Sequence, residues 1–222
     1  MIEKLVPPSV ACDESTTDVA ESLMLPAEAA QVANAVVKRR REFGTVRHCA
    51  RRALAELGVD PVPLLPGPNR EPLWPPGVVG SMTHCAGYRA AAVARAADVH
   101  SIGIDAEPHG PLPDGVLESI AREEELPRLA ELAAGEPTVH WDRMLFCAKE
   151  SVYKVWFPLA RRWLGFEDAS ITLRPGGEFH AALLVPGPSV AGVELTSVTG
   201  RWLVEADLVV TAICLPVAEA PN

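Results

Sequence analysis

The chain has 222 residues, of which 48% are hydrophobic and 22% charged, and this composition is ordinary for a soluble globular protein of one large or two small domains. Its formal net charge of −9 argues against general nucleic-acid binding, and no run approaches the ~20 apolar residues of a membrane span. Five widely spread cysteines without a C-x-x-C pair, and a start that lacks a secretory signal, favour a cytoplasmic protein with reduced thiols and no structural zinc.

The first half predicts helices followed by strands. An Ala/Val-rich pattern over residues 26–43 indicates an amphipathic helix that ends in a basic cluster at 38–41. Gly44 is expected to interrupt it, and Thr45 to cap a second helix. Residues 59–78 are rich in proline and glycine and predict a loop with defined turns. An apolar strand is expected at 78–82, and a second strand or a short helix at 88–96.

An acidic strand opens the second half. The sequence Ser101-Ile102-Gly103-Ile104 is apolar and β-prone, and Pro108 is expected to end the strand. Side chains on a strand alternate, so Asp105 and Glu107 are predicted to point to the same side. Such a pair is common in surface turns, and alone it would indicate nothing more.

A long helix follows, in which a third carboxylate lies close to two lysines. Thr138 is expected to cap it and Pro158 to end it. Glu150 and Lys154 are one turn apart on one face, with Lys149 beside them. Three carboxylates on two elements suit Mg²⁺, which prefers hard oxygen ligands and phosphate. The same oxygens accept Mn²⁺, and the sequence does not distinguish the two ions.

The rest of the chain predicts antiparallel strands. Residues 171–173 and 178–185 flank Pro175-Gly176-Gly177, which is a hairpin signal. Two further strands, 190–198 and 201–216, are expected on either side of Thr199-Gly200. Two aromatic residues that precede these strands, Tyr153 and Trp163, are predicted first as core residues and second as walls of a substrate tunnel.

Four motifs in order resemble one known family. They are Arg70-Glu71-Pro72-Leu73-Trp74-Pro75, Gly80-Ser81-Met82-Thr83-His84, Gly103-Ile104-Asp105-Ala106-Glu107 and, about forty residues later, Phe146-x-x-Lys149-Glu150-x-x-x-Lys154. Together they resemble the signature of the phosphopantetheinyl transferase superfamily, in its single-chain branch that serves siderophore, peptide and polyketide synthetases. The resemblance covers most of the chain, from about Arg39 to about Trp163.

The resemblance implies an architecture. We expect an α+β fold of two pseudo-equivalent halves, each a small antiparallel sheet packed with helices, with the active site at their interface. Residues 1–99 would form the half that binds the CoA nucleotide, and residues 100–222 the half that carries the metal ligands and catalytic carboxylates. Because both halves lie in one chain, the resemblance also implies a monomer.

The resemblance further implies a reaction and the residues that perform it. The phosphopantetheine group of CoA would be transferred, with Mg²⁺, to a serine of acyl or peptidyl carrier domains of polyketide and nonribosomal peptide synthetases, releasing 3′,5′-ADP. Glu150 would be the general base, directly or through a water. The full assignment is catalytic Glu150, Lys154 and Asp105; metal ligands Asp105, Glu107 and Glu150; and CoA-binding residues Arg39, Arg47, Thr83, His84, Lys149 and Lys154, the first two within an R-x-x-x-F-x-x-x-R-x-x-x-R clamp for the 3′-phosphate.

Two other functions use the same residues. A Mg²⁺-dependent phosphohydrolase or nucleotidyl transferase would need the same carboxylates, and a CoA- or carrier-binding module could keep the basic residues without catalysis. The intact carboxylates and lysines argue against the binding module. Incubation with CoA and an apo carrier domain distinguishes the two enzymes, because transfer adds mass to the carrier and hydrolysis releases phosphate.

Overall fold

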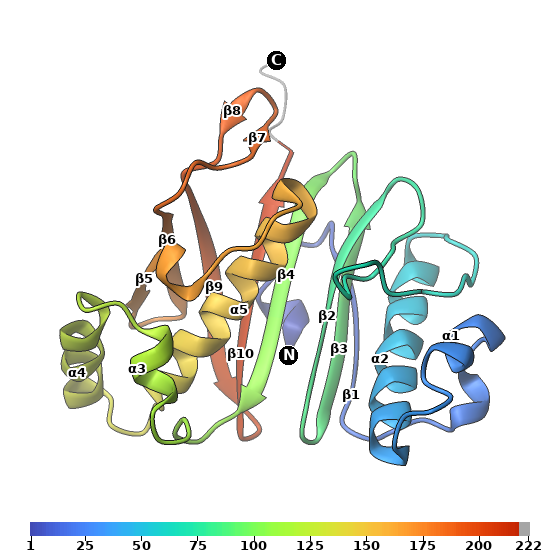
Figure 1. Cartoon of the computed structure of the whole chain (residues 1–222), viewed down its shortest axis with the longest axis horizontal. Helices are drawn as coiled ribbons and strands as arrows, with labels where there is room; N and C mark the ends of the chain where they lie inside the picture. The colour runs from blue at the N-terminus through green and yellow to red at the C-terminus, as the bar shows by residue number, and fades with distance from the viewer. Residues whose placement is uncertain (218–222) are drawn as a thin grey trace.

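The computed structural model describes residues 1–217, so the last five residues of the predicted second half lie outside it. Two units, each a sheet with a long helix on it, stand side by side (Figure 1). This arrangement confirms the predicted α+β class. Within the described part of the chain, no helix is long and apolar enough to cross a membrane.

The N-terminal unit is a three-stranded antiparallel sheet in the order β1-β3-β2. One face of the long helix α2 packs on β3, with Cys49, Ala50 and Ala53 against Ala91 and Val93. The predicted strand-or-helix at 88–96 is therefore a strand. The elements of this unit are η1 (Ile2–Lys4), β1 (Ala11–Ser15), η2 (Glu21–Leu23), α1 (Pro26–Gln31), α2 (Val37–Glu56), β2 (Val78–Cys85) and β3 (Tyr88–Arg95).

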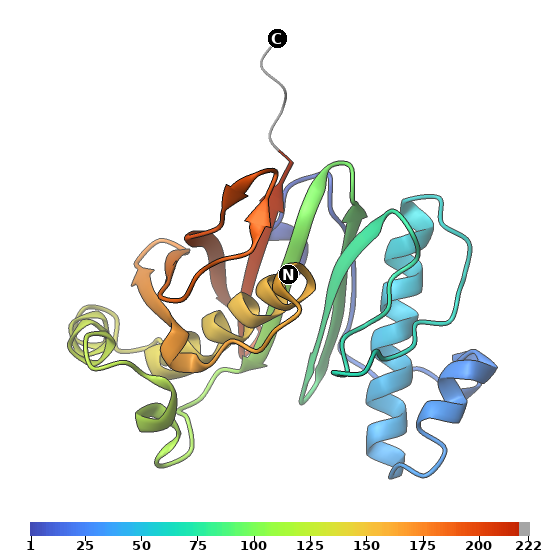
Figure 2. The same cartoon turned by 45° about the horizontal axis from the view of Figure 1, so that its top comes forward.

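The C-terminal unit is a five-stranded antiparallel sheet in the order β4-β10-β9-β6-β5, and α5 lies along one face of it (Figures 1 and 2). Its elements are β4 (Val99–Pro108), α3 (Val116–Ile120), α4 (Glu125–Gly135), α5 (Trp141–Ala160), η3 (Phe166–Asp168), β5 (Ala169–Arg174), β6 (Glu178–Leu183), β7 (Ser189–Val190), β8 (Val193–Glu194), β9 (Ser197–Glu205) and β10 (Leu208–Pro216). The strands β7 and β8 form a separate small hairpin.

The helix α2 is continuous through Gly44, which corrects the predicted interruption. A Cβ on Gly44 would come within 2.8 Å of Met24 Cγ, so this glycine serves a close contact with the preceding segment instead of ending the helix. Thr45 lies inside the helix and does not cap it. Its hydroxyl accepts a hydrogen bond from Val19 N at 3.0 Å, which ties the same preceding segment to α2.

The helix α5 runs antiparallel to β4 at very close range. A Cβ on Gly103 would collide with the carbonyl oxygen of Ser151, so only glycine allows this approach. Two residues before Gly103, Ser101 Oγ donates to Val155 O at 2.9 Å. The predicted ends of the helix were wrong, since Thr138 makes no cap and Pro158 lies inside the last turn.

The last hairpin turns later than predicted. Thr199 and Gly200 lie within β9, where Gly200 leaves room for the Phe179 ring. The chain turns instead at Ala206-Asp207, and both residues have positive φ, 51° and 58°.

The two units meet where β2 lies beside β4. Ser81 Oγ accepts from Ile104 N and Thr83 Oγ1 accepts from Ala106 N, each at 3.1 Å. Behind this junction, one apolar cluster contains residues of both sheets, such as Tyr88 and Ile104. The units therefore share a core, and β4 is held on both sides.

Candidate active site

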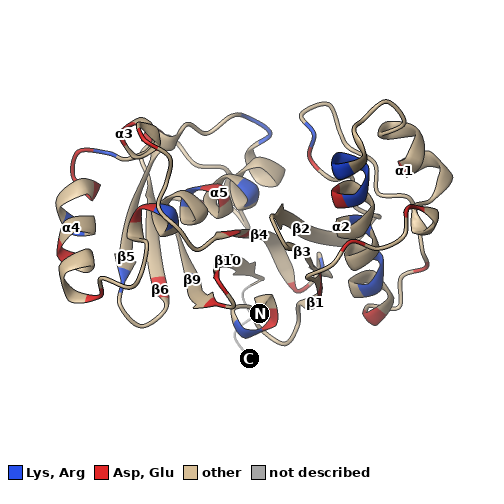
Figure 3. Ribbon diagram, turned by 90° about the horizontal axis from the view of Figure 1, so that it is seen from below, with Lys and Arg blue, Asp and Glu red and all other residues tan. Residues whose placement is uncertain are grey.

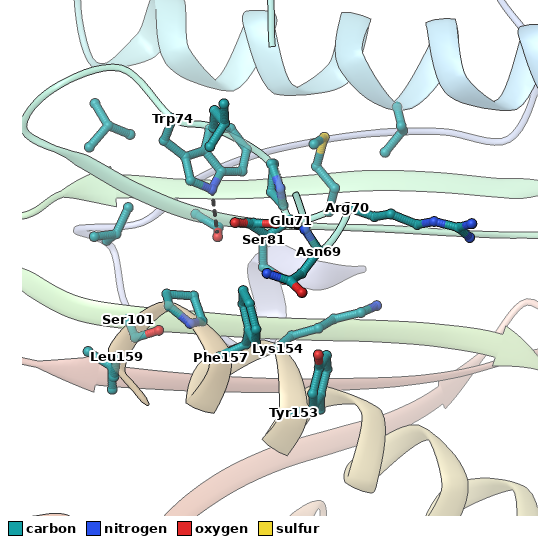
Figure 4. Close-up of a pocket in the computed structure, with 18 of the residues that line it drawn as sticks. Asn69, Arg70, Glu71, Trp74, Ser81, Ser101, Tyr153, Lys154, Phe157 and Leu159 are labelled. Carbon is teal, nitrogen blue, oxygen red and sulfur yellow. Dashed lines mark hydrogen bonds between the residues drawn. The ribbon is translucent and has the colours of Figure 1, made fainter. Parts of the chain in front are cut away.

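A cavity of about 560 Å³ lies between the two units (Figure 4). The helix α2 forms one side and α5 the opposite side, with β2 and the loop 69–74 completing the wall. Lysine and arginine positions occur on both helices, which lie on either side of β2 and β4 (Figure 3). The cavity therefore faces positive charge from two directions, although the whole chain is acidic.

Two predicted arginines and the predicted histidine line the N-terminal side of the cavity. Arg39 Nη1 lies 2.9 Å from His84 Nε2. Burial, and then the charge of Arg39, lowers the pKa of His84, so the neutral ring accepts this hydrogen bond. Arg47 lies over the Phe43 ring, 3.2 Å from its centroid, and its Nε donates to Leu64 O at 2.7 Å. Burial lowers the pKa of Arg47 to about 10, which leaves it charged at neutral pH.

The third arginine of the predicted clamp does not reach the cavity. Arg51 forms a buried ion pair with Glu28 at 2.6 Å and donates to Leu23 O. Glu28 is fully buried and also accepts from Leu64 N at 3.0 Å. This pair joins α1, α2 and the loop after α2. Its effect is to fix the helix that carries Arg39 and Arg47.

Asp105 is the centre of a buried polar group at the junction. Its Oδ1 accepts from Thr83 Oγ1 at 3.0 Å and from Lys154 Nζ at 2.7 Å. Its Oδ2 is buried and has no hydrogen-bond partner among the described residues. The single donor of the Thr83 hydroxyl is directed to Asp105 in this structure, and the contact of Thr83 with CoA stays a prediction. Burial disfavours the Lys154 ammonium, but the charge and hydrogen bond of Asp105, together with the charge of Glu150, outweigh burial and raise the pKa of Lys154.

The other two carboxylates lie within electrostatic range of Asp105. Burial first, and then the charge of Asp105, raises the pKa of Glu107 and also that of Glu150. Glu107 Oε2 accepts from Arg143 Nη1 at 3.1 Å, and Glu150 lines the cavity. Among residues 1–217, however, no three His, Cys, Asp or Glu side chains stand together as a preformed metal-binding group.

These oxygens nevertheless fit a divalent cation that binds together with a ligand. Mg²⁺ usually takes one or two carboxylates and completes its shell with water and phosphate oxygens, so a full protein cage is not required. The buried Oδ2 of Asp105 has no donor within the described part of the chain, and such an atom is costly unless something binds it. The ligand set of Asp105, Glu107 and Glu150 stays a prediction that this chemistry supports.

Lys149 is placed differently from the sequence prediction. Its ammonium is buried and forms an ion pair with Glu125 at 3.0 Å. It also donates to Phe166 O at 2.8 Å and to Ala169 O at 3.1 Å. Three oxygen partners use its three donors, so Lys149 joins α4, α5 and β5 in this structure, and its contact with CoA stays a prediction.

The structure adds residues that the motifs did not assign. Trp74 approaches the cavity from the side opposite to the predicted Lys154 (Figure 4), and its Nε1 donates to Gly80 O at 3.0 Å. Arg161 pairs with Glu71 across the cavity at 3.5 Å, which joins the two units at the surface. Arg143 binds Glu107. The sequence could have indicated Arg143, because it lies about two helical turns before Glu150 and therefore on the same face of the helix.

A smaller hollow of about 100 Å³ lies on the outer side of Glu150. Tyr153 and Trp163 line it, with ring centroids 5.0 Å apart. Trp163 is 74% exposed, so the prediction of a core residue was wrong for it. The alternative, that these rings flank a tunnel, stays a prediction.

Comparison with known proteins shows the family of this chain. The model of the 4′-phosphopantetheinyl transferase N-terminal domain matches residues 27–94, and that of the 4′-phosphopantetheinyl transferase superfamily matches residues 101–211. The chain is 55% identical to 4′-phosphopantetheinyl transferase Svp of Streptomyces mobaraensis, over 97% of this chain and 89% of that protein. It is 54% identical to 4′-phosphopantetheinyl transferase PptT of Mycobacterium tuberculosis, over 86% of each, and 31% identical to enterobactin synthase component D of Salmonella typhi, over 79% and 72%. The chain therefore belongs to the 4′-phosphopantetheinyl transferase superfamily, as its motifs predicted.

Proposed function

We propose that this phosphopantetheinyl transferase moves the phosphopantetheine group of CoA to a serine of acyl or peptidyl carrier domains, as a Mg²⁺- or Mn²⁺-dependent monomer. The observation that carries the proposal is the cavity between the units, with Arg39, Arg47 and His84 on one side and Glu150 and Lys154 on the other. This is the charge arrangement that a nucleotide with a pyrophosphate requires.

The basic side of the cavity binds the nucleotide phosphates. Arg47 Nη2 makes no hydrogen bond with a described residue, and the planar guanidinium suits two phosphate oxygens at once. Arg39 and His84 already bind each other, so a phosphate next to them meets two groups that are held in place. The 3′-phosphate of CoA is the group assigned to these residues.

The acidic side of the cavity positions the reacting atoms. When bound, the cation would be held by Asp105, Glu107 and Glu150 and would neutralise the charge that develops on the leaving 3′,5′-ADP. Lys154 donates to Ile104 O and Asp105 Oδ1, so its ammonium is fixed beside the carboxylates while it still lines the cavity. It adds positive charge to the pyrophosphate.

Glu150 receives the proton of the attacking serine, directly or through a water. Burial and the nearby Asp105 raise its pKa, which makes it a better base than an exposed glutamate. The serine oxygen forms a bond to the β-phosphorus of CoA, the pyrophosphate bond breaks, and 3′,5′-ADP leaves with the bonding electrons. The products are the holo carrier domain and the nucleotide.

The test is a mass measurement on a panel of apo carrier domains incubated with CoA, Mg²⁺ and the protein. A gain of one phosphopantetheine on the carrier serine supports transfer. Release of inorganic phosphate without this gain would instead support the phosphohydrolase, and metal-independent CoA binding without turnover would support a binding module.

Glu150→Ala is the variant that tests the assigned base. We expect transfer to be lost, because both the proton acceptor and a cation ligand are removed, while the melting temperature stays close to that of the wild type. Glu123→Ala is a suitable control, since Glu123 lies at the surface away from the cavity. Full activity of Glu150→Ala with Mg²⁺ would remove both assigned roles.

A further inference from the structure

The first turn of α5 holds the segment that leaves β4, and Arg143 supplies most of the contacts. Its Nη1 donates to Glu107 Oε2 at 3.1 Å, its Nε to Gly110 O at 3.2 Å and its Nη2 to Pro111 O at 2.7 Å. Beside it, Asp142 Oδ2 accepts from Leu112 N at 2.7 Å. The end of β4 and the next few residues are thus fixed to α5.

The contacts of Arg143 also determine how Glu107 is presented. Arg143 binds one carboxylate oxygen, Oε2, and leaves Oε1 for another partner. The side chains of the pair are only 16% and 22% exposed, so water competes weakly for the contact. The guanidinium is planar, and because its three nitrogens have different partners it cannot rotate without losing hydrogen bonds.

Arg143 and Lys154 form a pattern along α5. Lys154 binds Asp105, Arg143 binds Glu107, and Glu150 lies between the two cations on the same face of the helix. Each carboxylate of β4 is therefore held by a basic residue of α5, which is also the helix that supplies the third carboxylate. Mutation of a group that orients a metal ligand in this way typically lowers metal affinity by about 10- to 100-fold.

We propose that Arg143 is a positioning residue for divalent-cation binding, acting through Glu107 and the end of β4. The inference rests on the carboxylate set assigned above, but it concerns a residue that does not itself ligate. The affinity of the protein for the cation falls when residue 143 cannot fix the Glu107 carboxylate, even if the positive charge at this position is kept.

A competing role for Arg143 gives the opposite result. If the guanidinium only occupied the carboxylate that the cation needs, its charge would oppose cation binding. Arg143→Lys separates the two roles. The charge is retained, but a single ammonium cannot reproduce the planar contact with Glu107, Gly110 and Pro111.

The experiment measures Mn²⁺ binding to the full chain without CoA, from the electron paramagnetic resonance signal of free Mn²⁺. We expect Arg143→Lys to weaken binding by about 10-fold or more. Arg128→Lys is the matched control, because Arg128 lies in the same unit and its side chain hydrogen-bonds only Thr172 among residues 1–217, and it should bind as the wild type does. Unchanged or tighter binding by Arg143→Lys overturns the proposal.

Two further measurements locate the effect. In a Glu107→Gln background, Arg143→Lys should cause no additional loss of Mn²⁺ affinity, and an undiminished loss there would overturn the route through Glu107. In the transfer assay, Arg143→Lys should raise the Mg²⁺ concentration for half-maximal rate while the rate at saturating Mg²⁺ is largely kept. A loss of folded protein alone would lower the rate at all Mg²⁺ concentrations, and that result counts against the proposal.

Failure of this inference can be told from failure of the carboxylate set. Asp105→Asn must lower Mn²⁺ affinity if the set is correct. If it does and Arg143→Lys does not, only the role of Arg143 is overturned. If Asp105→Asn binds Mn²⁺ as the wild type does, the assigned set fails, and the role of Arg143 fails with it.

Discussion

At the scale of single residues, the charged side chains of this protein divide into those that face the cavity and those that hold its walls. Arg39, Arg47 and Lys154 face it, whereas Arg51 and Lys149 are buried in ion pairs with Glu28 and Glu125. The second group looks the same in the sequence. Substitution of Arg51 or Lys149 should nevertheless lower the stability of the fold and leave ligand binding unchanged, and both quantities can be measured.

Arg47→Ala tests the assignment of the 3′-phosphate. A charge-assisted hydrogen bond contributes about 1.5–3 kcal/mol, so we expect CoA affinity to fall roughly 10- to 100-fold. Affinity for dephospho-CoA should change little, because it lacks the phosphate. Both ligands are titrated calorimetrically into the same variant, so any effect of the substitution on folding is the same for the two affinities that are compared. Equal losses would show that Arg47 does not recognise this group.

Lys149→Met tests whether Lys149 stabilises the fold or binds CoA. It leaves Glu125 buried without its cation, which costs about 3–5 kcal/mol in the free energy of unfolding. Urea denaturation should show this loss, and adding Glu125→Gln should restore part of it. The folded protein should bind CoA as before. Weaker CoA binding at unchanged stability would show that Lys149 binds CoA, as the sequence predicted.

The sequence was informative about residues whose spacing determines direction. Alternation along a strand predicted that Asp105 and Glu107 share a side, and a four-residue step predicted that Glu150 and Lys154 share a face. Lys149 was assigned to CoA because it adjoins Glu150. Neighbours on a helix point about 100° apart, however, and Lys149 faces the core of its own unit.

At the scale of elements, the close approach of α5 to β4 sets the site. Gly103 is the residue that permits it, and the two basic residues of α5 then reach the two carboxylates of β4. The sequence predicted both elements but not their contact. The wrong predictions at Gly44 and Gly200 have the same cause, since glycine in those places serves tertiary packing and not a turn.

Gly103→Ala is expected to separate α5 from β4. The added methyl group meets backbone atoms of α5 that cannot rotate away, so the loss of stability should lie at the upper end of the roughly 1–3 kcal/mol typical of overpacking. Transfer should also fall, because Glu150 and Lys154 move away from Asp105. Both are measured by urea denaturation and the carrier mass assay.

Gly44→Ala is the matched control for that variant. Its methyl group meets the flexible Met24 side chain, and alanine favours the helix by about 1 kcal/mol, so stability should change little. If Gly44→Ala proved as destabilising as Gly103→Ala, the difference between rigid and flexible neighbours would not explain these glycines.

At the scale of the whole molecule, the two units are joined through hydroxyl groups where β2 meets β4. Ser81 and Thr83 each accept a backbone N–H of β4, and Thr83 also donates to Asp105. The boundary near residue 100 was predicted, and the family models that end at 94 and begin at 101 are compatible with it. The junction itself was not predictable, because hydroxyls at strand positions carry no signal of their partners.

Thr83→Val compared with Ser81→Ala tests this junction. Thr83→Val leaves Ala106 N without its acceptor, at a cost of about 1–3 kcal/mol, and removes one of the two donors to Asp105 Oδ1. Ser81→Ala leaves only Ile104 N without its acceptor and does not touch Asp105. Both variants should unfold at lower urea concentration. Thr83→Val alone should also raise the Mg²⁺ concentration needed for transfer. An equal Mg²⁺ requirement in both variants would show that Thr83 does not affect cation binding through Asp105.

The exposure of Trp163 has a practical consequence. Of the five tryptophans, Trp141, Trp156 and Trp202 are at most 9% exposed and Trp74 is half-buried, so Trp163, at 74%, is the indole most accessible to solvent. Collisional quenchers such as acrylamide will therefore act mainly on its fluorescence. Trp163 is thus an intrinsic fluorescent reporter that lines the same hollow as Glu150. Anything that covers this hollow should reduce the quenching, which can be measured without a label.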